Sequence, residues 1–290
     1  MPYVRLYARP SPRPSSAVKP DPAAARSGLD AFVAIVKKAV SAPRLPKPAA
    51  ANSVVVDPGG KTFSTIGAAL DSITDAGLQK QYTVSIGAGT YNEVLTCKSW
   101  VFLVGTGPDQ TLITALSEAN PFVAGTVKAA SNSAVQNCTI RATTTGTFGD
   151  SVTAVNCQGA VNFDIENCAL LAISATNQTN VTGILLDYWG NAAGSQVNIS
   201  YTTVTAKGGA APLALSTGWY TYVHGMESRF IAEGGQQPWG CAAIDESIIL
   251  VENCYVEGAE FSLWQDSTGR ITANQCQLVG PVGPGVVVNN

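Results

Sequence analysis

Short apolar runs alternate with small polar residues along most of the chain, and one pattern of positions recurs. An apolar residue is followed by two mostly polar residues, a Cys-like position, and a second apolar residue five positions after the first. The pattern occurs in VQNCTI from 135, IENCAL from 165, ISYTTV from 199, MESRFI from 226, VENCYV from 251 and ANQCQL from 273. The Cys-like positions are Cys138, Cys168, Thr202, Arg229, Cys254 and Cys276, at intervals of 22 to 34 residues. Such a repeat is too short for a domain and too irregular for a helical solenoid.

The residues around each repeat predict strands. Segments such as VNFDIENCALL and SIILVENCYVEG are rich in Val, Ile and Thr, and Gly and Asn bound them. These residues favour strands over helices. A strand repeat of this length is typical of an all-β solenoid, in which each coil buries its apolar face by stacking on its neighbours. We therefore expect Asn at one corner of each coil and the small Cys side chain inside it.

A second column of positions lies between these corners. Strand-like runs precede the repeats, and their ends align Asn156, Asp187, Ser216, Asp245 and Gln265 or Asp266. Two interpretations remain open from the sequence. The column is either a solvated face of a stacked sheet or a surface that faces a glycan.

The first fifty residues differ from the rest in charge. They hold 9 of the 17 basic residues and only two acids, a balance of +7, whereas the remainder holds 8 basic and 18 acidic residues, a balance of −10. Nine of the 16 prolines also precede residue 49. The sequence thus predicts a basic, extended arm over residues 1–50, including Arg5, Arg9 and Arg13, and a separate acidic body over 51–290.

One amphipathic helix is expected within the arm, over about residues 27–41. Its apolar face has helical spacing and consists of Leu29, Phe32, Val33, Val36 and Val40. Such a face must be buried, either on the body or on another chain. We expect docking on other protein chains. Nucleic acid is not expected, because the basic residues are spread among prolines.

Composition excludes several classes of site. Only 13% of the residues are charged, and no run of 18 apolar residues predicts a membrane span. The start of the chain shows no secretory signal. The seven cysteines contain no C-x-x-C pair and have no histidine nearby, so we expect free, mostly buried thiols, no metal and no cofactor.

Three segments resemble the opening of pectin methylesterases. VVVDPGGKTFSTIGAALDSI from 54, QYTVSIGAGTYNEVL from 81 and SWVFLVGTGPDQTLI from 99 are similar to that family in order and spacing. The resemblance implies a right-handed parallel β-helix of the pectin-lyase type. It also implies that residues 64–74 form a helix that caps the first coil.

The catalytic motifs of that family do not match. The family's esterases use an aspartate nucleophile, a second carboxylate as acid/base, and glutamines that stabilise the oxyanion. The first aspartate belongs to G-Y-Q-D-T-L-Y, which follows a C-x-x-x-G corner. Here that corner is Cys254 to Gly258, and the aspartate position is Phe261; the aligned first glutamine position is Ser151. We therefore assign no catalytic residues, and the departure argues against esterase activity.

Aromatic residues near the ends of the strand-like runs that precede the repeats are the remaining candidates for contact with a ligand. They are Tyr188, Trp189, Trp219, Tyr220, Tyr222, Trp239 and Trp264. Together with Asp187, Asp245 and Asp266, all of them except Tyr222 form the predicted glycan-binding set, because aromatic faces stack on sugar rings. The single histidine, His224, is expected to be structural.

Three functions remain open. The first is a non-enzymatic structural or adhesion protein of a virion or extracellular assembly, such as a phage spike or fibre, with a homo-oligomeric, for example trimeric, body that contacts a surface polysaccharide. The second is a carbohydrate-active enzyme (esterase, lyase or glycosidase) with a carboxylate site of unrecognised type, drawn from Asp187, Asp245, Glu246, Glu260 and Asp266. The third is a soluble carbohydrate-binding remnant of an esterase.

Overall fold

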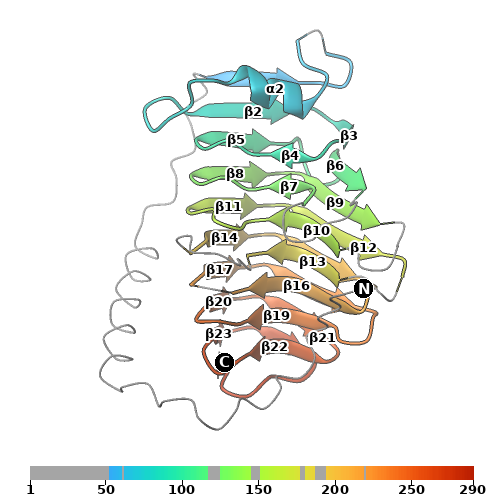
Figure 1. Cartoon of the computed structure of the whole chain (residues 1–290), viewed down its shortest axis with the longest axis vertical. Coiled ribbons are helices and arrows are strands. Elements are labelled where there is room, and N and C mark those ends of the chain that lie inside the picture. The colour runs from blue at the N-terminus through green and yellow to red at the C-terminus, as the bar shows by residue number, and fades with distance from the viewer. Residues whose placement is uncertain are drawn as a thin grey trace, which may run out of the picture. The chain divides into compact units, whose positions relative to one another are not determined.

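The body is a parallel β-helix of about eight turns (Figure 1). The computed structural model describes residues 52–60, 62–116, 125–144, 151–176, 180–186, 194–218 and 220–290. The predicted all-β solenoid is confirmed. The predicted arm, with its helix over about 27–41, lies outside the described residues.

Three parallel sheets form the walls of the solenoid, and each complete coil contributes one strand to each sheet. The ten-stranded sheet consists of β1 (Ser53–Val56), β2 (Tyr82–Ile86), β5 (Val101–Val104), β8 (Ser133–Gln136), β11 (Phe163–Glu166), β14 (Gln196–Ser200), β17 (Tyr222–Met226), β20 (Ile248–Glu252), β23 (Arg270–Asn274) and β25 (Val287–Asn289). The eight-stranded sheet consists of β3 (Gly89–Asn92), β6 (Thr111–Leu116), β9 (Thr139–Thr144), β12 (Ala169–Ser174), β15 (Thr203–Lys207), β18 (Arg229–Glu233), β21 (Tyr255–Gly258) and β24 (Gln277–Val279). The seven-stranded sheet consists of β4 (Leu95–Thr96), β7 (Val127–Lys128), β10 (Ser151–Asn156), β13 (Asn180–Leu185), β16 (Ala211–Thr217), β19 (Trp239–Ala243) and β22 (Phe261–Gln265).

The interior is filled by columns of side chains in register from coil to coil. On the ten-stranded sheet, Val135 pairs with Ile165, and Ile165 pairs with Ile199. All three side chains are at most 1% exposed. β-Branched side chains suit this arrangement because they pack well on the pleated surface and against their equivalents one strand away.

The repeated Asn-Cys phrase forms the corner between the ten-stranded and eight-stranded sheets. From β8 onward this corner always has two residues. The first has positive φ, at Asn137, Asn167, Tyr201, Glu227, Asn253 and Gln275. The second points inward and is Cys138, Cys168, Thr202, Ser228, Cys254 or Cys276. Asn recurs at the first position because it tolerates the left-handed conformation better than most residues.

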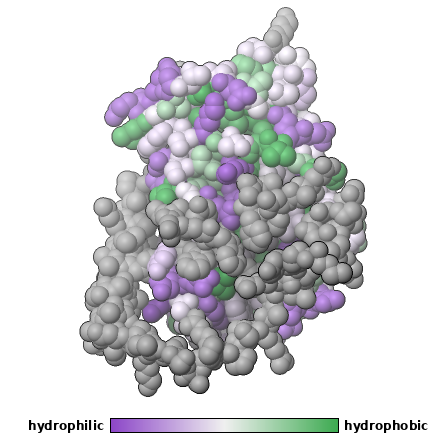
Figure 2. Space-filling model, viewed as in Figure 1, coloured by the Kyte–Doolittle hydropathy of each residue, from purple (hydrophilic) through white to green (hydrophobic). Residues whose placement is uncertain are grey.

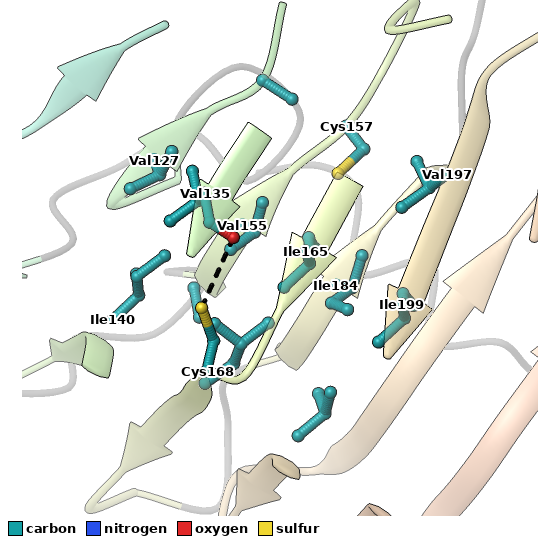
Figure 3. Packing of buried hydrophobic residues seen from close by; sticks show 14 of the residues in the cluster. Val127, Val135, Ile140, Val155, Cys157, Ile165, Cys168, Ile184, Val197 and Ile199 are labelled. Carbon is teal, nitrogen blue, oxygen red and sulfur yellow. Dashed lines mark hydrogen bonds between the residues drawn. The ribbon is translucent and has the colours of Figure 1, made fainter. Parts of the chain in front are cut away.

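A hydrogen-bond ladder runs through these inward-facing corner residues. The Thr202 hydroxyl donates to the carbonyl of Ser200 (2.9 Å) and accepts from the backbone N–H of Cys168 (3.3 Å). The Ser228 hydroxyl in turn accepts from the N–H of Thr202 (3.2 Å). Figure 3 shows the Cys168 thiol in the apolar interior, where it donates to the carbonyl of Val135 (3.6 Å). At Cys168 and Thr202 the next coil therefore satisfies the corner N–H, so small thiol or hydroxyl side chains are favoured here.

The sequence placed the wrong residue in this ladder at the fourth repeat. Gly225 pairs with Ile199 and Val251, so the ladder residue is Ser228, which is 2% exposed, and Arg229 is exposed. The Arg229 guanidinium lies over the Tyr255 ring, 4.8 Å from its centroid. The error has a physical reason: a buried guanidinium without a partner would cost several kcal/mol, on the order of the penalty for any buried ion, whereas serine completes the ladder.

The seven cysteines lie along the interior columns. All are free, six are buried, and Cys276 is half-buried. The prediction of free, mostly buried thiols is confirmed.

A short helix, α2 (Ile66–Ser72), covers the first coil beside β2 (Figure 1). Ile66, Ala69 and Leu70 are buried beneath it, and Thr65 is its N-cap. The predicted cap at residues 64–74 is confirmed. Among the described residues, no helix has the length and apolar character needed to cross a membrane.

Candidate functional site

The outer face of the seven-stranded sheet carries two columns of side chains in register. The first column is Thr153, Thr182, Leu213, Trp239 and Phe261. The second column is Thr96, Lys128, Asn156, Leu185, Ser216, Ala242 and Trp264. Between the two columns, consecutive side chains such as Ala154 and Val155 both belong to the core. This local break in alternation sets the spacing of the outward-facing positions.

The predicted polar column is correct at two positions only. Asn156 and Ser216 do share a column, but the register places Leu185, Ala242 and Trp264 in the other coils. Asp245 and Asp266 instead follow the strands, in the turns toward the ten-stranded sheet. The prediction failed because it aligned polar residues at the ends of runs, whereas backbone pairing aligns residues within the strands.

Three aromatic side chains gather at the C-terminal end of this face. The rings of Trp239 and Trp264 are stacked, with centroids 4.9 Å apart and an interplanar angle of 22°. Phe261 meets Trp239 edge-on, with centroids 6.4 Å apart. All three are half-buried. We call Trp239, Phe261 and Trp264 the aromatic cluster.

The aromatic cluster occupies the position at which the esterase resemblance places a catalytic aspartate. Phe261 pairs directly with Trp239 in the first column. Neither column contains Asp or Glu among its described members. A phenyl ring can neither attack an ester nor transfer a proton, so Phe261 cannot act as the nucleophile of esterase chemistry. Ser151, at the aligned first glutamine position, is buried in β10.

Asp245 and Asp266, the two described carboxylates of the predicted glycan-binding set, belong to stacked turns. Asp266 Oδ1 accepts hydrogen bonds from the backbone N–H groups of Thr268 (2.8 Å) and Gly269 (2.6 Å) and from the Thr268 hydroxyl (3.0 Å). Its Oδ2 accepts from the N–H of Asp245 (3.3 Å). Burial alone would raise the pKa of Asp266, but these hydrogen bonds outweigh it and hold the pKa below its usual value. Asp266 therefore organises the turn.

Tyr220 lies on the same stack of turns. Its N–H donates to the carbonyl of Asp245 (3.3 Å), and its side chain is 52% exposed. The nearby Glu246 raises the pKa of the Tyr220 phenol. The structure thus brings Tyr220, Asp245 and Asp266 together on one stack of turns. Trp264 precedes Asp266 by two residues, so the aromatic cluster and this stack are adjacent along the chain.

Some predicted members cannot be placed with this group. Asp187, Tyr188, Trp189 and Trp219 lie outside the described residues. Tyr222 is buried in β17 of the ten-stranded sheet. Burial raises its pKa to about 12. Tyr222 therefore does not lie on the face that carries the aromatic cluster.

The sequence did not reveal a polar network on the outer face of the ten-stranded sheet. His224 Nε2 lies 2.8 Å from Glu252 Oε2, and the Asn274 amide donates to Glu252 Oε1 (3.1 Å). The hydrogen bond with His224 contributes most to lowering the pKa of Glu252, and the one from Asn274 adds to it. The network joins three successive coils, which supports a structural role for His224. In the sequence, this network is indicated only by the spacing of His224, Glu252 and Asn274, which lie about one coil apart.

The described ranges contain no set of side chains suited to bind a metal ion. Nowhere in them do three His, Cys, Asp or Glu side chains gather closely enough to hold an ion.

Solved structures with the same fold include pectin methylesterases. The enzyme from carrot aligns with a TM-score of 0.54 and 16% identity over 84% of this chain and 90% of the carrot chain. The rice weevil enzyme gives a TM-score of 0.55 and 13% identity over 86% and 85% of the two chains. The Aspergillus niger enzyme gives 0.52 and 15% over 84% and 82%. No protein-family model matches the sequence. No curated protein matches it in sequence.

These matches establish the class of the fold. The chain forms a parallel β-helix similar to that of pectin methylesterases, as its N-terminal segments predict. Sequence identities of 13 to 16% support a similarity of fold, and they do not show a shared activity.

Proposed function

We propose that the protein is a carbohydrate-binding protein without esterase activity. The observation that carries the proposal is the aromatic cluster. It lies on the outer face of the seven-stranded sheet, where the esterase resemblance expects a carboxylate. In place of a nucleophile, this face offers apolar rings.

Aromatic rings of this kind suit a sugar ligand. Tryptophan presents a large, flat, apolar surface at a small cost in conformational entropy, and sugar C–H groups pack against such a surface. Stacking of Trp239 on Trp264 fixes both rings before a ligand arrives. A pre-ordered surface lowers the entropic cost of binding.

The charge of the body narrows the class of glycan. Residues 51–290 carry 8 basic and 18 acidic residues. This negative balance repels a polyanion such as fully de-esterified pectate. The proposed ligand is therefore a neutral or highly methyl-esterified polysaccharide.

Binding and turnover measurements test the proposal together. Titration calorimetry with highly methyl-esterified pectin should show binding, and pectate should bind more weakly. Trp264→Ala and Trp239→Ala should each weaken binding about tenfold or more, because each removes a stacking surface worth about 1–2 kcal/mol. Tyr201→Ala is the control: Tyr201 is an aromatic residue that is 52% exposed, but it lies at the corner between the other two sheets.

Two results would contradict the proposal. Methanol release from the same pectin above the blank would show an esterase. Equal binding by the Trp264→Ala and Tyr201→Ala variants would remove the aromatic cluster from the site.

A role in an assembly is a second candidate. Its specific support is the segregation of charge between the basic arm and the acidic body in the sequence. In this proposal the arm docks on other protein chains, as in a virion spike, fibre or decoration protein, and the body is displayed. The two proposals are compatible, because a displayed body can bind a surface polysaccharide.

A further inference from the structure

The last coil of the solenoid is uncharged. Residues 271–290, which we call the final coil, contain no Asp, Glu, Lys, Arg or His. They form part of β23, all of β24 and all of β25. β24 and β25 are the terminal strands of their sheets, so one edge of each has no neighbouring strand among the described residues.

The apolar side chains of the final coil are open to solvent. The exposed valines are Val279 (38%), Val282 (41%), Val287 (51%) and Val288 (38%). Leu278 and Val286, which pack against the core, are only partly buried. At the opposite end, Ile66 and Leu70 of α2 are 0% and 3% exposed. The described structure therefore caps one end of the core and leaves the other without a cap.

The two ends also differ in charge. The segment around α2 carries exposed Asp71 and the ion pair of Asp75 with Lys80. Figure 2 shows hydrophilic patches among hydrophobic ones over this part of the molecule. Charged residues commonly protect the open edges of sheets and the ends of solenoids from further pairing. Within residues 271–290, no charged side chain offers such protection.

We propose that the final coil is the contact surface for a second copy of this chain, which stacks end to end to form a two-fold dimer. A surface that meets its own copy must be self-complementary. The final coil meets this requirement because it brings no like charges together. Its edge strands and its Asn and Gln side chains supply both hydrogen-bond donors and acceptors.

The two-fold arrangement also matches the edges that are open. A two-fold axis perpendicular to the solenoid brings β25 of one copy alongside β25 of the other in antiparallel orientation. Antiparallel strands pair readily along their edges. The facing valines, Val279, Val287 and Val288, would then be removed from water.

A head-to-tail arrangement fits the structure less well. It would place the final coil of one copy on the capped end of the next, where α2 and the charged residues Asp71, Asp75 and Lys80 cover the core. Head-to-tail contacts also generate open polymers. The uncharged surface thus favours a closed dimer. This inference does not depend on glycan binding.

Sedimentation velocity and light scattering on the 290-residue protein test the dimer. Over about 1 to 100 µM, a range typical of measurable self-association, the mass should reach twice the chain mass of 30.0 kDa. Val287→Lys and Val279→Lys should each weaken association at least about tenfold, because they bring like charges together at the contact. Val55→Lys is the matched control. Val55 is a 59% exposed valine in β1, the terminal strand at the other end, and this variant should remain dimeric.

Three outcomes would overturn the proposal. They are a monomer at every concentration, a dimer that both final-coil lysine variants leave intact, and a mass beyond two chains that persists when residues 1–50 are deleted. Circular dichroism shows whether each variant is folded. If Val287→Lys unfolds the protein, Asn289→Lys gives the same test, because Asn289 is an exposed polar residue on β25.

Discussion

At the scale of single residues, the thiol of Cys276 lies in a different environment from the other thiols. Hydrogen bonding with the Cys254 side chain, together with the N–H of Cys254 (3.4 Å), lowers the pKa of Cys276 to about 7. The same interaction and burial raise the pKa of Cys254. Burial alone raises that of Cys97 to about 12. Cys276 is also the one half-buried cysteine of the seven.

Cys276 should therefore react first with an alkylating agent. At pH 7 about half of its thiol would be ionised, and the thiolate is the reactive form. The rate of iodoacetamide labelling should rise with pH through a midpoint near 7, because the group loses its proton there. Peptide mass mapping identifies the site, and Cys276→Ser should abolish the fast phase. Labelling of buried Cys97 or Cys157 at the same rate would contradict the assignment.

At the scale of elements, the cap of the first coil depends on a residue from another turn. The Glu93 carboxylate accepts hydrogen bonds from the N–H groups of Ile66 (2.9 Å) and Gly67 (2.8 Å) at the start of α2. The first N–H groups of a helix have no partner within the helix. Glu93 follows β3, so this contact ties the cap to the wall of the solenoid.

Removal of this carboxylate should destabilise the body. Glu93→Ala should lower the free energy of unfolding by about 1–3 kcal/mol, because two charge-assisted hydrogen bonds are lost. Glu93→Gln should cost less, since one amide oxygen can still accept. Urea unfolding measures both, with Glu260→Ala, at an exposed glutamate, as the control. A Glu93→Ala change no larger than that of the control would show that α2 does not need this contact.

The elements also differ in how well the sequence predicts them. Corners marked Asn-Cys were predictable because a left-handed position selects Asn and the ladder selects a small side chain. The corner at Glu227 and Ser228 has neither Asn nor Cys. The pattern therefore selects Met226, one residue too late, as the first apolar position of this repeat. The outer columns were harder to predict, because Ala154 and Val155 both face inward and break the alternation. The sequence therefore predicted Trp239 and Trp264 as contact residues, but it predicted neither Phe261 as their neighbour nor the register that brings the three rings together.

At the scale of the whole molecule, the described body contains its own continuous core. The core extends from Val56 in β1 to Ala273 in β23 and includes side chains of all three sheets. Stability in such a solenoid comes from contacts between neighbouring coils. Residues 1–50 are therefore expected to serve association and not the folding of the body.

Deletion of residues 1–50 tests this expectation. The remaining body should unfold cooperatively with a nearly unchanged melting temperature, as measured by circular dichroism. If the arm docks on other chains, any assembly larger than the end-to-end dimer should disappear. Phe32→Asp in the full chain is the milder companion, since it disrupts only the predicted apolar face. A body that fails to fold without the arm would assign residues 1–50 to folding.

The corner between the ten-stranded and eight-stranded sheets has a constant length, and this determines where the chain can accept insertions. From β8 onward it keeps two residues, whereas the segment between β10 and β11 has six and that between β19 and β20 has four. Coils of unequal length therefore stay in step, because every coil is aligned at the same corner. The molecule can accept insertions at its other two corners without shifting its strands, which makes it a scaffold on which new loops can be displayed side by side.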